Sequence, residues 1–306
     1  MKTGAALKEY LKEKRGQVDK VLDDYLPKAD MHPKALHQAI RYSLFAGGKR
    51  IRPILCIASC EAVGGDADAV LPAASAIELV HTYSLIHDDL PAMDNDDFRR
   101  GRPTNHKVYG ESIAILAGDA LLTSAFDMIA DKGLNNRLEP DTLITVIKIL
   151  AAASGSLGMV GGQAADIQAS GKDVDLPDVE YIHTHKTGAL ILASVRIGAI
   201  AGAGSRGERP FAPTLAALTR FGECIGLAFQ IVDDILDIEG SREEIGKDVG
   251  SDIAKKKVTY PSVIGISESK KRASELLEMA LDSVSAFDEK AEPLRQIAGY
   301  IIERRS

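Results

Sequence analysis

The segment Phe229–Asp237 places carboxylates along one face of a helix that is otherwise apolar. At about 100° per residue, its polar side chains form a single stripe. That stripe consists of Gln230, Asp233, Asp234 and Asp237. Aliphatic side chains fill the rest of the surface, which predicts a buried helix. Carboxylates on a buried stripe repel one another and require cations. A solvated face is the alternative, but it would normally carry lysine or glutamate in the same stripe.

A second acidic segment, Leu85–Asp94, brings Asp88, Asp89 and Asp94 to the end of another apolar run. Aspartate is a poor helix former and is seldom buried unless its charge is compensated. Pro91 predicts that the helix ends or kinks, and Asp94 needs this bend to reach the face of Asp88. Oxygen ligands favour Mg2+ over Ca2+, and no histidine or cysteine spacing indicates zinc.

Cationic residues that suit phosphate groups lie near both acidic segments. Mg2+ usually binds a few carboxylates together with substrate phosphates, so we expect phosphate contacts close to these aspartates. The candidates lie in Gly47–Pro53, Arg99–Pro103 and Lys186–Gly188, with Lys247 and Lys257 further on. One such residue alone is more often a surface charge. Together with two acidic segments, they predict a phosphorylated substrate.

Turn residues recur at helix spacing, and Val and Ile do not alternate with polar residues for long. We therefore predict an all-α fold in a single domain, 1–306, because no long or low-complexity linker divides the chain. A polar loop is expected at Asn95–Gly110, and Lys186–Gly188 interrupts a helix. The expected helices are Ala5–Tyr25, His32–Gly48, Pro53–Gly65, Ala67–Leu90, Glu111–Ala130, Pro140–Ala169, Asp178–Ala201, Pro213–Ile238, and Pro261 to the C-terminus with a break near Ala291–Pro293.

The composition limits the classes of function. The chain has 306 residues, 45% hydrophobic and 26% charged, which is typical of a globular protein. Its net charge of -7 argues against nucleic-acid binding and against attraction to an anionic membrane. Three cysteines without a CxxC pair suit a reducing compartment. The N-terminus has no apolar targeting region, and the run Ile149–Ala165 is short for a membrane span. We expect a cytoplasmic protein without membrane spans.

These motifs resemble those of the trans-isoprenyl diphosphate synthases, the chain-elongating prenyltransferases. Asp-Asp-Leu-Pro-Ala-Met-Asp is similar to the first aspartate-rich motif of that family, and Asp-Asp-Ile-Leu-Asp to the second. The family order and spacing also hold for Gly-Gly-Lys-Arg-Ile-Arg-Pro, Arg-Arg-Gly-Arg-Pro-Thr, Lys-Thr-Gly and Phe-Gln. The resemblance extends from about Lys34 to Pro261 and has the character of a bacterial farnesyl diphosphate synthase, close to short-chain geranylgeranyl enzymes.

The resemblance implies a homodimer and an isoprenoid synthase-like bundle of roughly ten or more helices around a central cavity. It implies that isopentenyl diphosphate condenses with dimethylallyl and then geranyl diphosphate, giving (2E,6E)-farnesyl diphosphate. Diphosphate leaves the allylic substrate, the isopentenyl double bond attacks the resulting cation, and the released diphosphate accepts the proton. Three Mg2+ ions and cationic side chains stabilise the leaving charge.

The motif match assigns roles to individual residues. The metal ligands are Asp88, Asp89, Asp94, Asp233, Asp234 and Asp237. The contacts to the allylic diphosphate are Arg99, Lys186, Lys247 and Lys257. The contacts to isopentenyl diphosphate are Lys49, Arg52, His81 and Arg100. Thr187 and Gln230 present oxygens toward the developing cation. The catalytic candidates are Asp88, Asp94, Lys186, Thr187, Gln230 and Asp233.

Product length depends on how far the tail can grow along the helix that carries Asp88. Tyr83 and Ser84 lie roughly 6–8 Å before Asp88 on that helix, at 1.5 Å per residue. Tyr83 either closes the tunnel, which favours a C15 product, or serves only as core packing. A geranylgeranyl diphosphate synthase with a C20 product is the main alternative. A terpene cyclase would not need the second cationic site, and a non-catalytic partner subunit could lose the acidic motifs that are intact here.

Overall fold

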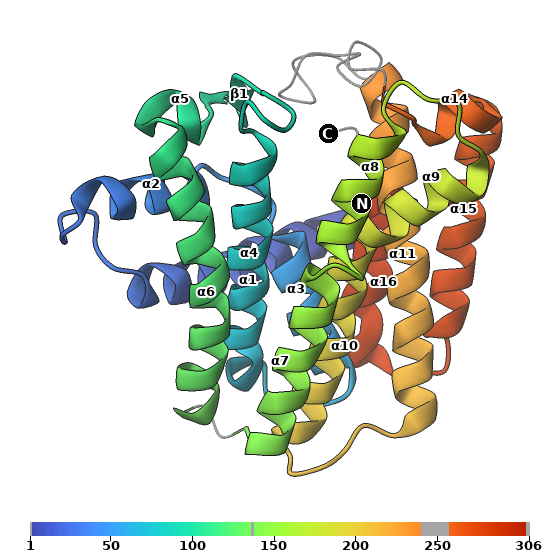
Figure 1. Cartoon of the computed structure of the whole chain (residues 1–306). Coiled ribbons are helices and arrows are strands. Elements are labelled where there is room, and N and C mark those ends of the chain that lie inside the picture. Colours follow the sequence, from blue (N-terminus) through green and yellow to red (C-terminus); the bar gives the residue numbers. More distant parts are fainter. Residues whose placement is uncertain (1, 136–137, 240–256, 304–306) are drawn as a thin grey trace.

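The structure is a computed structural model that describes residues 2–135, 138–239 and 257–303 (Figure 1). The all-α prediction is confirmed, because helices make up these residues except for loops and one short antiparallel hairpin. The elements are α1 (Lys2–Tyr25), α2 (Lys34–Leu44), α3 (Ile51–Ala62), α4 (Ala67–Asp88), β1 (Phe98–Arg99), β2 (Arg102–Pro103), α5 (Asn105–Tyr109), α6 (Glu111–Asn135), α7 (Pro140–Ser154), α8 (Met159–Ala169), α9 (Leu176–Ile182), the π-helical turn η1 (His183–Gly188), α10 (Ala189–Gly204), α11 (Ala212–Glu239), α14 (Tyr260–Ile264), α15 (Ile266–Ser283), the 3-10 turn η2 (Glu289–Ala291) and α16 (Glu292–Glu303).

Four expected elements differ from the structure. The region from Pro261 onward is not one helix with a break near Ala291–Pro293, because it already divides after Ile264 and after Ser283. The region 140–169 is two helices, because the chain breaks at the glycine-containing stretch between α7 and α8. The region expected as one helix at Asp178–Ala201 consists of α9, η1 and α10, so the predicted interruption at Lys186–Gly188 is a π-helical turn. The expected loop Asn95–Gly110 contains β1, β2 and α5, and Phe98 pairs with Pro103 in the hairpin.

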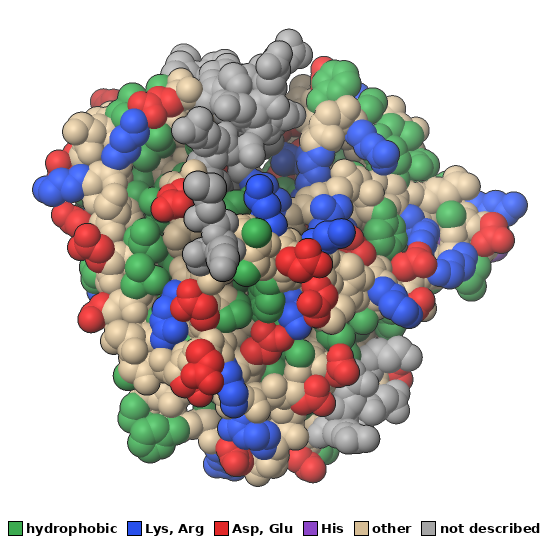
Figure 2. Space-filling view, turned by 180° about the vertical axis from the view of Figure 1, so that it is seen from behind, with side chains coloured by type: hydrophobic (Ala, Val, Ile, Leu, Met, Phe, Trp, Pro, Cys, Tyr) green, Lys and Arg blue, Asp and Glu red, His purple; other side chains and the backbone are tan. Residues whose placement is uncertain are grey.

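The long helices lie side by side, and α4 packs against α1, α3, α6 and α10 (Figure 1). The first buried apolar cluster joins α4 and α6 to parts of α1, α2 and α7. The second joins α11 and α15 to α16. Both clusters include residues of α3 and α10, so these two helices connect them. The single-domain assignment stays a prediction. On the face opposite to that of Figure 1, acidic and basic side chains are interspersed (Figure 2).

Five helical segments among the described residues are long and apolar enough to cross a membrane, judged by length and composition alone. They differ in how far the bundle covers them. The most apolar stretches of Ala67–Asp88 and Leu176–Gly204 are 78% and 72% buried. Those of Glu111–Asp131 and Pro140–Ala169 are only 39% and 33% buried. The stretch of Ala212–Glu239 lies between these values at 56%. The segments therefore range from internal helices to helices with an open apolar face.

Candidate active site

The chain folds back on itself directly after α4. The helix ends at Asp88, and the Asp94 amide donates a hydrogen bond of 2.8 Å to the Asp88 carbonyl oxygen. The Asn95 amide donates to the Leu90 carbonyl at 3.1 Å and closes the same turn. The predicted bend near Pro91 is therefore present, and it brings the first and last aspartates of this segment together.

Cations from distant segments surround these two aspartates. Burial raises the pKa of Asp88, while the charges of Lys186, Arg99 and Lys257 act in the opposite direction. The ammonium group of Lys257 lies 2.9 Å from a carboxylate oxygen of Asp94. The partly buried carboxylate pair is suited to hold a metal ion, and the flanking cations are suited to hold a diphosphate group.

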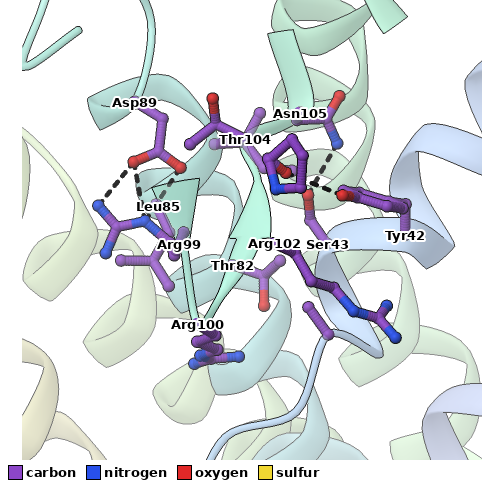
Figure 3. Close-up of a pocket in the computed structure, with 13 residues that line it drawn as sticks. Tyr42, Ser43, Thr82, Leu85, Asp89, Arg99, Arg100, Arg102, Thr104 and Asn105 are labelled. Carbon is purple, nitrogen blue, oxygen red and sulfur yellow. Dashed lines mark hydrogen bonds and ion pairs between the residues drawn. The ribbon is translucent and has the colours of Figure 1, made fainter. Parts of the chain in front are cut away.

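Asp89, the second aspartate of the segment, faces a protein partner (Figure 3). Its side chain is buried, and the Arg99 Nε donates to its two carboxylate oxygens at 2.8 and 2.9 Å. The Arg99 Nη2 lies 2.6 Å from Oδ1. A cavity of about 30 Å³ beside this pair has room only for a water or two. The predicted metal role of Asp89 and phosphate role of Arg99 stay predictions, and in this structure the two groups bind each other.

The second acidic segment lies inside α11 and repeats this pattern at Asp234. The Tyr260 amide donates to Asp234 Oδ2 at 2.8 Å, and Nε2 of His183 lies 2.8 Å from the same oxygen. The Gln230 amide donates to Oδ1 at 3.0 Å. Asp234 is only 3% exposed, so its carboxylate is enclosed by these neighbours. Asp233 is half-buried, and Asp237 is 8% exposed.

The π-helical turn η1 brings Lys186 and Thr187 to the same region. The Thr187 hydroxyl donates to Gln230 Oε1 at 2.9 Å, and the Lys186 ammonium group lies 2.6 Å from Asp166 on α8. Glycines permit this close packing. A Cβ on Gly226 of α11 would lie 2.9 Å from the Cα of Gly188, closer than real contacts allow. The close approach of the η1 and α11 backbones at these two glycines therefore places Thr187 beside Gln230.

A group of arginines surrounds His81 on α4. Burial lowers the pKa of His81 well below its ordinary value, and the charges of Arg52 and Arg100 add to this effect. Arg100 donates a hydrogen bond to the Gly47 carbonyl and packs on Gly48. Gly48 has a φ of 125°, a backbone conformation that residues with a Cβ rarely adopt, so glycine is strongly favoured there. A neutral imidazole among guanidinium groups is suited to an anionic ligand.

The other cationic candidates have aromatic neighbours. The Lys49 ammonium group lies 5.6 Å from the ring centre of Tyr300, and the Arg52 guanidinium lies 5.9 Å from that of Phe229. Both distances allow a cation–π contact. Lys247 lies outside the described residues.

Arg50 has a structural role that the sequence does not reveal. It is 3% exposed and has a left-handed backbone conformation at φ 54°. Its guanidinium donates to Asp19 at 2.9 Å, to Glu78 at 2.7 Å and to the Leu44 carbonyl at 2.6 Å. These bonds tie α1, α2 and α4 to the loop that carries Lys49 and Arg52. Arg50 lies between the candidate ligands Lys49 and Arg52 in the sequence, and nothing in this local pattern predicts that its side chain is buried.

Tyr83 and Ser84 lie within α4. Tyr83 is 6% exposed, and its ring meets the His87 ring edge-on at 5.7 Å. The Ser84 hydroxyl donates to the His81 carbonyl at 2.9 Å. Tyr83 belongs to the first buried apolar cluster, so it packs in the core, and its role in product length stays a prediction.

The acidic residues fit a hard cation by the chemistry of their donors. Asp88 and Asp94 supply oxygen donors only, and burial of Asp88 makes a cationic partner favourable. Among the described residues, no group of three or more His, Cys, Asp or Glu side chains is already gathered as a metal site. A substrate phosphate would complete such a site, as Mg2+ commonly requires.

Comparison with known proteins shows the class of this chain. The family model described as polyprenyl synthetase matches residues 33–297. The chain therefore belongs to this family, the trans-isoprenyl diphosphate synthases, and the predicted relationship is confirmed. It is a prenyltransferase, and the family uses a divalent metal.

Individual relatives are similar to this chain over nearly its whole length. The chain is 48% identical to the large subunit 1 of a heterodimeric geranylgeranyl pyrophosphate synthase of Arabidopsis thaliana, over 97% of this chain and 79% of that protein. It is 47% identical to a geranylgeranyl diphosphate synthase of Cyanophora paradoxa, over 100% and 99%. A solved FPP/GFPP synthase of Zymomonas mobilis shares 36% identity with a TM-score of 0.84, over 97% and 99%. The isoprenoid synthase-like fold is thereby confirmed.

Proposed function

We propose that this protein is a Mg2+-dependent geranylgeranyl diphosphate synthase. It would condense isopentenyl diphosphate with dimethylallyl, geranyl and farnesyl diphosphate. The observation that carries the condensation is the presence of two separate cationic groups, because two diphosphates must bind. Lys186 and Lys257 accompany Asp88 and Asp94, whereas Arg52 and Arg100 surround His81.

The proposed C20 product rests on the relatives. The expectation of a farnesyl product is not confirmed, because the relatives are mostly geranylgeranyl synthases. Farnesyl diphosphate is the second candidate product, since the solved Zymomonas mobilis relative is an FPP/GFPP synthase.

The chain's own residues perform three tasks in this proposal. Asp88, Asp94 and Asp233 would hold three Mg2+ ions, which neutralise the charge that develops on the leaving diphosphate. Lys186 and Lys257 orient the allylic diphosphate at the mouth of the site. Thr187 and Gln230, already joined by a hydrogen bond of 2.9 Å, direct oxygen atoms at the allylic carbon.

The second aspartate of each pair is a positioning residue in this proposal. Asp89 holds Arg99 in a fixed orientation through two hydrogen bonds from Nε. Asp234 holds Gln230 at 3.0 Å and thereby directs its other amide atom to Thr187. Fewer aspartates then bind metal than the two acidic motifs contain.

A homodimer is part of the proposal. Helices α6 and α7 expose large apolar side chains, including Ile115 at 42%, Leu116 at 51% and Ile144 at 64%. These helices lie next to each other and carry weakly buried apolar stretches (Figure 1). A second copy would cover this face, which we propose in place of a membrane span. Three free, buried cysteines support a reducing compartment, and we propose the cytoplasm.

Product analysis tests the proposal. The purified chain is incubated with isopentenyl diphosphate, Mg2+ and each allylic diphosphate in turn, and the dephosphorylated products are separated by length. We expect C20 as the main product from every starter. C15 as the end product would support the second candidate. No elongation without an added partner would favour a non-catalytic subunit.

A further inference from the structure

A cavity of about 470 Å³ lies outside the candidate active site, against η1, α10, α11 and α15. This volume is in the range of small-molecule sites, roughly 300–1,000 Å³. Apolar side chains form most of its wall, namely Leu157, Ala189, Leu192, Leu227, Leu276 and Met279. Such a wall suits a hydrocarbon chain rather than a sugar or a nucleotide.

Two arginines give the cavity a polar end. Arg220 lies 3.8 Å from Glu223, and Arg272 lies 3.8 Å from Glu180 and 3.6 Å from Glu275. These ion pairs are longer than a charge-assisted hydrogen bond of about 2.7–2.9 Å. Both arginines line the cavity, and so does Glu223, the partner of Arg220. An anionic group that displaced this carboxylate could form shorter contacts with the two arginines.

Two of the elements that line the cavity, η1 and α11, also carry catalytic candidates. On η1, Thr184 and His185 line the cavity, and the next residues, Lys186 and Thr187, belong to the active site. On α11, Leu227 lines the cavity one turn before Gln230. A ligand that shifted η1 against α11 would disturb the 2.9 Å hydrogen bond between Thr187 and Gln230.

A chain of polar contacts connects the same two places. Arg272 pairs with Glu180, which accepts a hydrogen bond of 2.6 Å from the Tyr260 hydroxyl. The Tyr260 amide donates to Asp234 at 2.8 Å, and Asp234 accepts from Gln230 at 3.0 Å. Movement of Arg272 toward a ligand would thus act on the residues that orient Gln230.

We propose that this cavity binds an amphiphile with an extended apolar chain and a single anionic head group, and that its occupancy inhibits the active site. Leu192, Leu227 and Leu276 hold the chain, and Arg220 and Arg272 bind the head group. The proposed binding rests on the cavity and its lining residues alone. The inhibition rests on the proposed function, because it requires η1 and α11 to carry the prenyl transfer.

Binding can be measured with a tryptophan at the cavity, since the chain contains none. Leu157 lines the cavity and is 86% exposed, so Leu157→Trp places the only tryptophan there. Phe211, 72% exposed and outside the cavity lining, gives the matched control Phe211→Trp. Laurate and dodecyl phosphate serve as probes that distinguish a carboxylate head from a phosphate head. Dodecanol has the same chain length without a charge.

We expect both anions to change the fluorescence of Leu157→Trp in a saturable manner and to leave Phe211→Trp unchanged. Adding Arg220→Gln should weaken binding about tenfold, equivalent to about 1.4 kcal/mol, and dodecanol should bind about tenfold more weakly than laurate. Equal responses of the two tryptophan variants, or no saturation in calorimetric titration of the unmodified protein, would overturn the proposed site.

Inhibition is measured on the unmodified enzyme. Saturating laurate should lower kcat at least twofold, and Arg220→Gln should raise the required laurate concentration about tenfold. An unchanged or higher kcat, with binding established, would overturn the inhibitory coupling. A protein that binds laurate but elongates no allylic diphosphate even without it would instead contradict the proposed function.

Discussion

The two acidic segments use adjacent aspartates in the same way but hold them by different means. Asp89 and Asp234 are each 3% exposed and bind protein partners. Asp89 pairs with the charged guanidinium of Arg99, whereas Asp234 is held by an amide side chain, an imidazole and a backbone N–H. In the proposed function, the preceding aspartate of each pair, Asp88 or Asp233, is the one that would hold a metal ion.

The segments also differ in backbone. The first leaves its helix at Asp88 and closes a turn through the Asp94 amide, so its outer aspartates meet although they are six positions apart. The second stays helical through Asp237, and regular helix spacing aligns its carboxylates. One segment thus brings its carboxylates together through a turn, and the other through a continuous helix.

The largest predicted effect concerns the first aspartate of each pair. Asp88→Asn and Asp233→Asn should each lower kcat by at least about 10²–10³-fold, the loss typical of removing one charge-stabilising contact. Steady-state kinetics at saturating Mg2+ measure this effect. Asp282→Asn, exposed near the end of α15, is the matched control and should retain full turnover. Wild-type turnover in both active-site variants would contradict the metal assignment.

The second aspartates should differ in their contribution to stability. Asp234→Ala leaves buried donors on Tyr260 and Gln230 without their acceptor, and should lower the free energy of unfolding by about 3 kcal/mol. Asp89→Ala should cost about 1–2 kcal/mol, because the Arg99 side chain is 18% exposed and reaches solvent. Urea unfolding measures both values, and a larger cost at Asp89 would reverse the comparison.

Product length provides a further test of the first segment. Tyr83→Ala should shift the main product to longer chains, because the buried ring lies on the helix along which the tail is expected to grow. Chromatography of the dephosphorylated products measures the shift, and Tyr83→Phe is the control that keeps the ring. An unchanged product distribution in Tyr83→Ala would assign this residue to core packing alone.

The smallest predicted effect is a pH dependence. The pKa of His81 is lowered in the folded protein, so only the unfolded chain takes up this proton as the pH falls below about 6.5. The related stability is present above that pH and is lost toward the folded pKa, by at most about 1.4 kcal/mol per pH unit. Urea unfolding from pH 8 to 5 should show a shallower decline for His81→Gln. Identical slopes for variant and wild type would contradict a neutral His81.

Much of this arrangement could be predicted from the sequence. Helix positions followed from apolar periodicity and from Pro and Gly, and α4 and α11 lie within two residues of the expected bounds. The bend after Asp88 followed from Pro91, whose missing N–H cannot continue the helix. The interruption at Lys186–Gly188 was also expected, although not as a π-helical turn.

Tertiary contacts account for what the sequence did not reveal. The metal stripe of α11 was expected to include Asp234, but its partners His183 and Tyr260 are distant in sequence. The Asp89–Arg99 pair depends on the hairpin of β1 and β2, whose strands are too short to show a period. Arg50 is buried by contacts with α1 and α4 that no local pattern encodes.

Mg2+ titration of turnover in Asp233→Asn and Asp234→Asn tests most directly whether the two aspartates of a pair have different tasks. Residual activity is measured over a wide range of Mg2+ concentrations at saturating substrates. We expect Asp233→Asn to raise the half-saturating Mg2+ concentration at least about tenfold. The reason is that losing a metal ligand that contributes roughly 1.4 kcal/mol or more to binding weakens the affinity by that factor. Asp234→Asn should leave that concentration within about twofold of wild type and lower stability instead. Equal shifts in both variants, or a larger shift in Asp234→Asn, would contradict the division of tasks between the two aspartates.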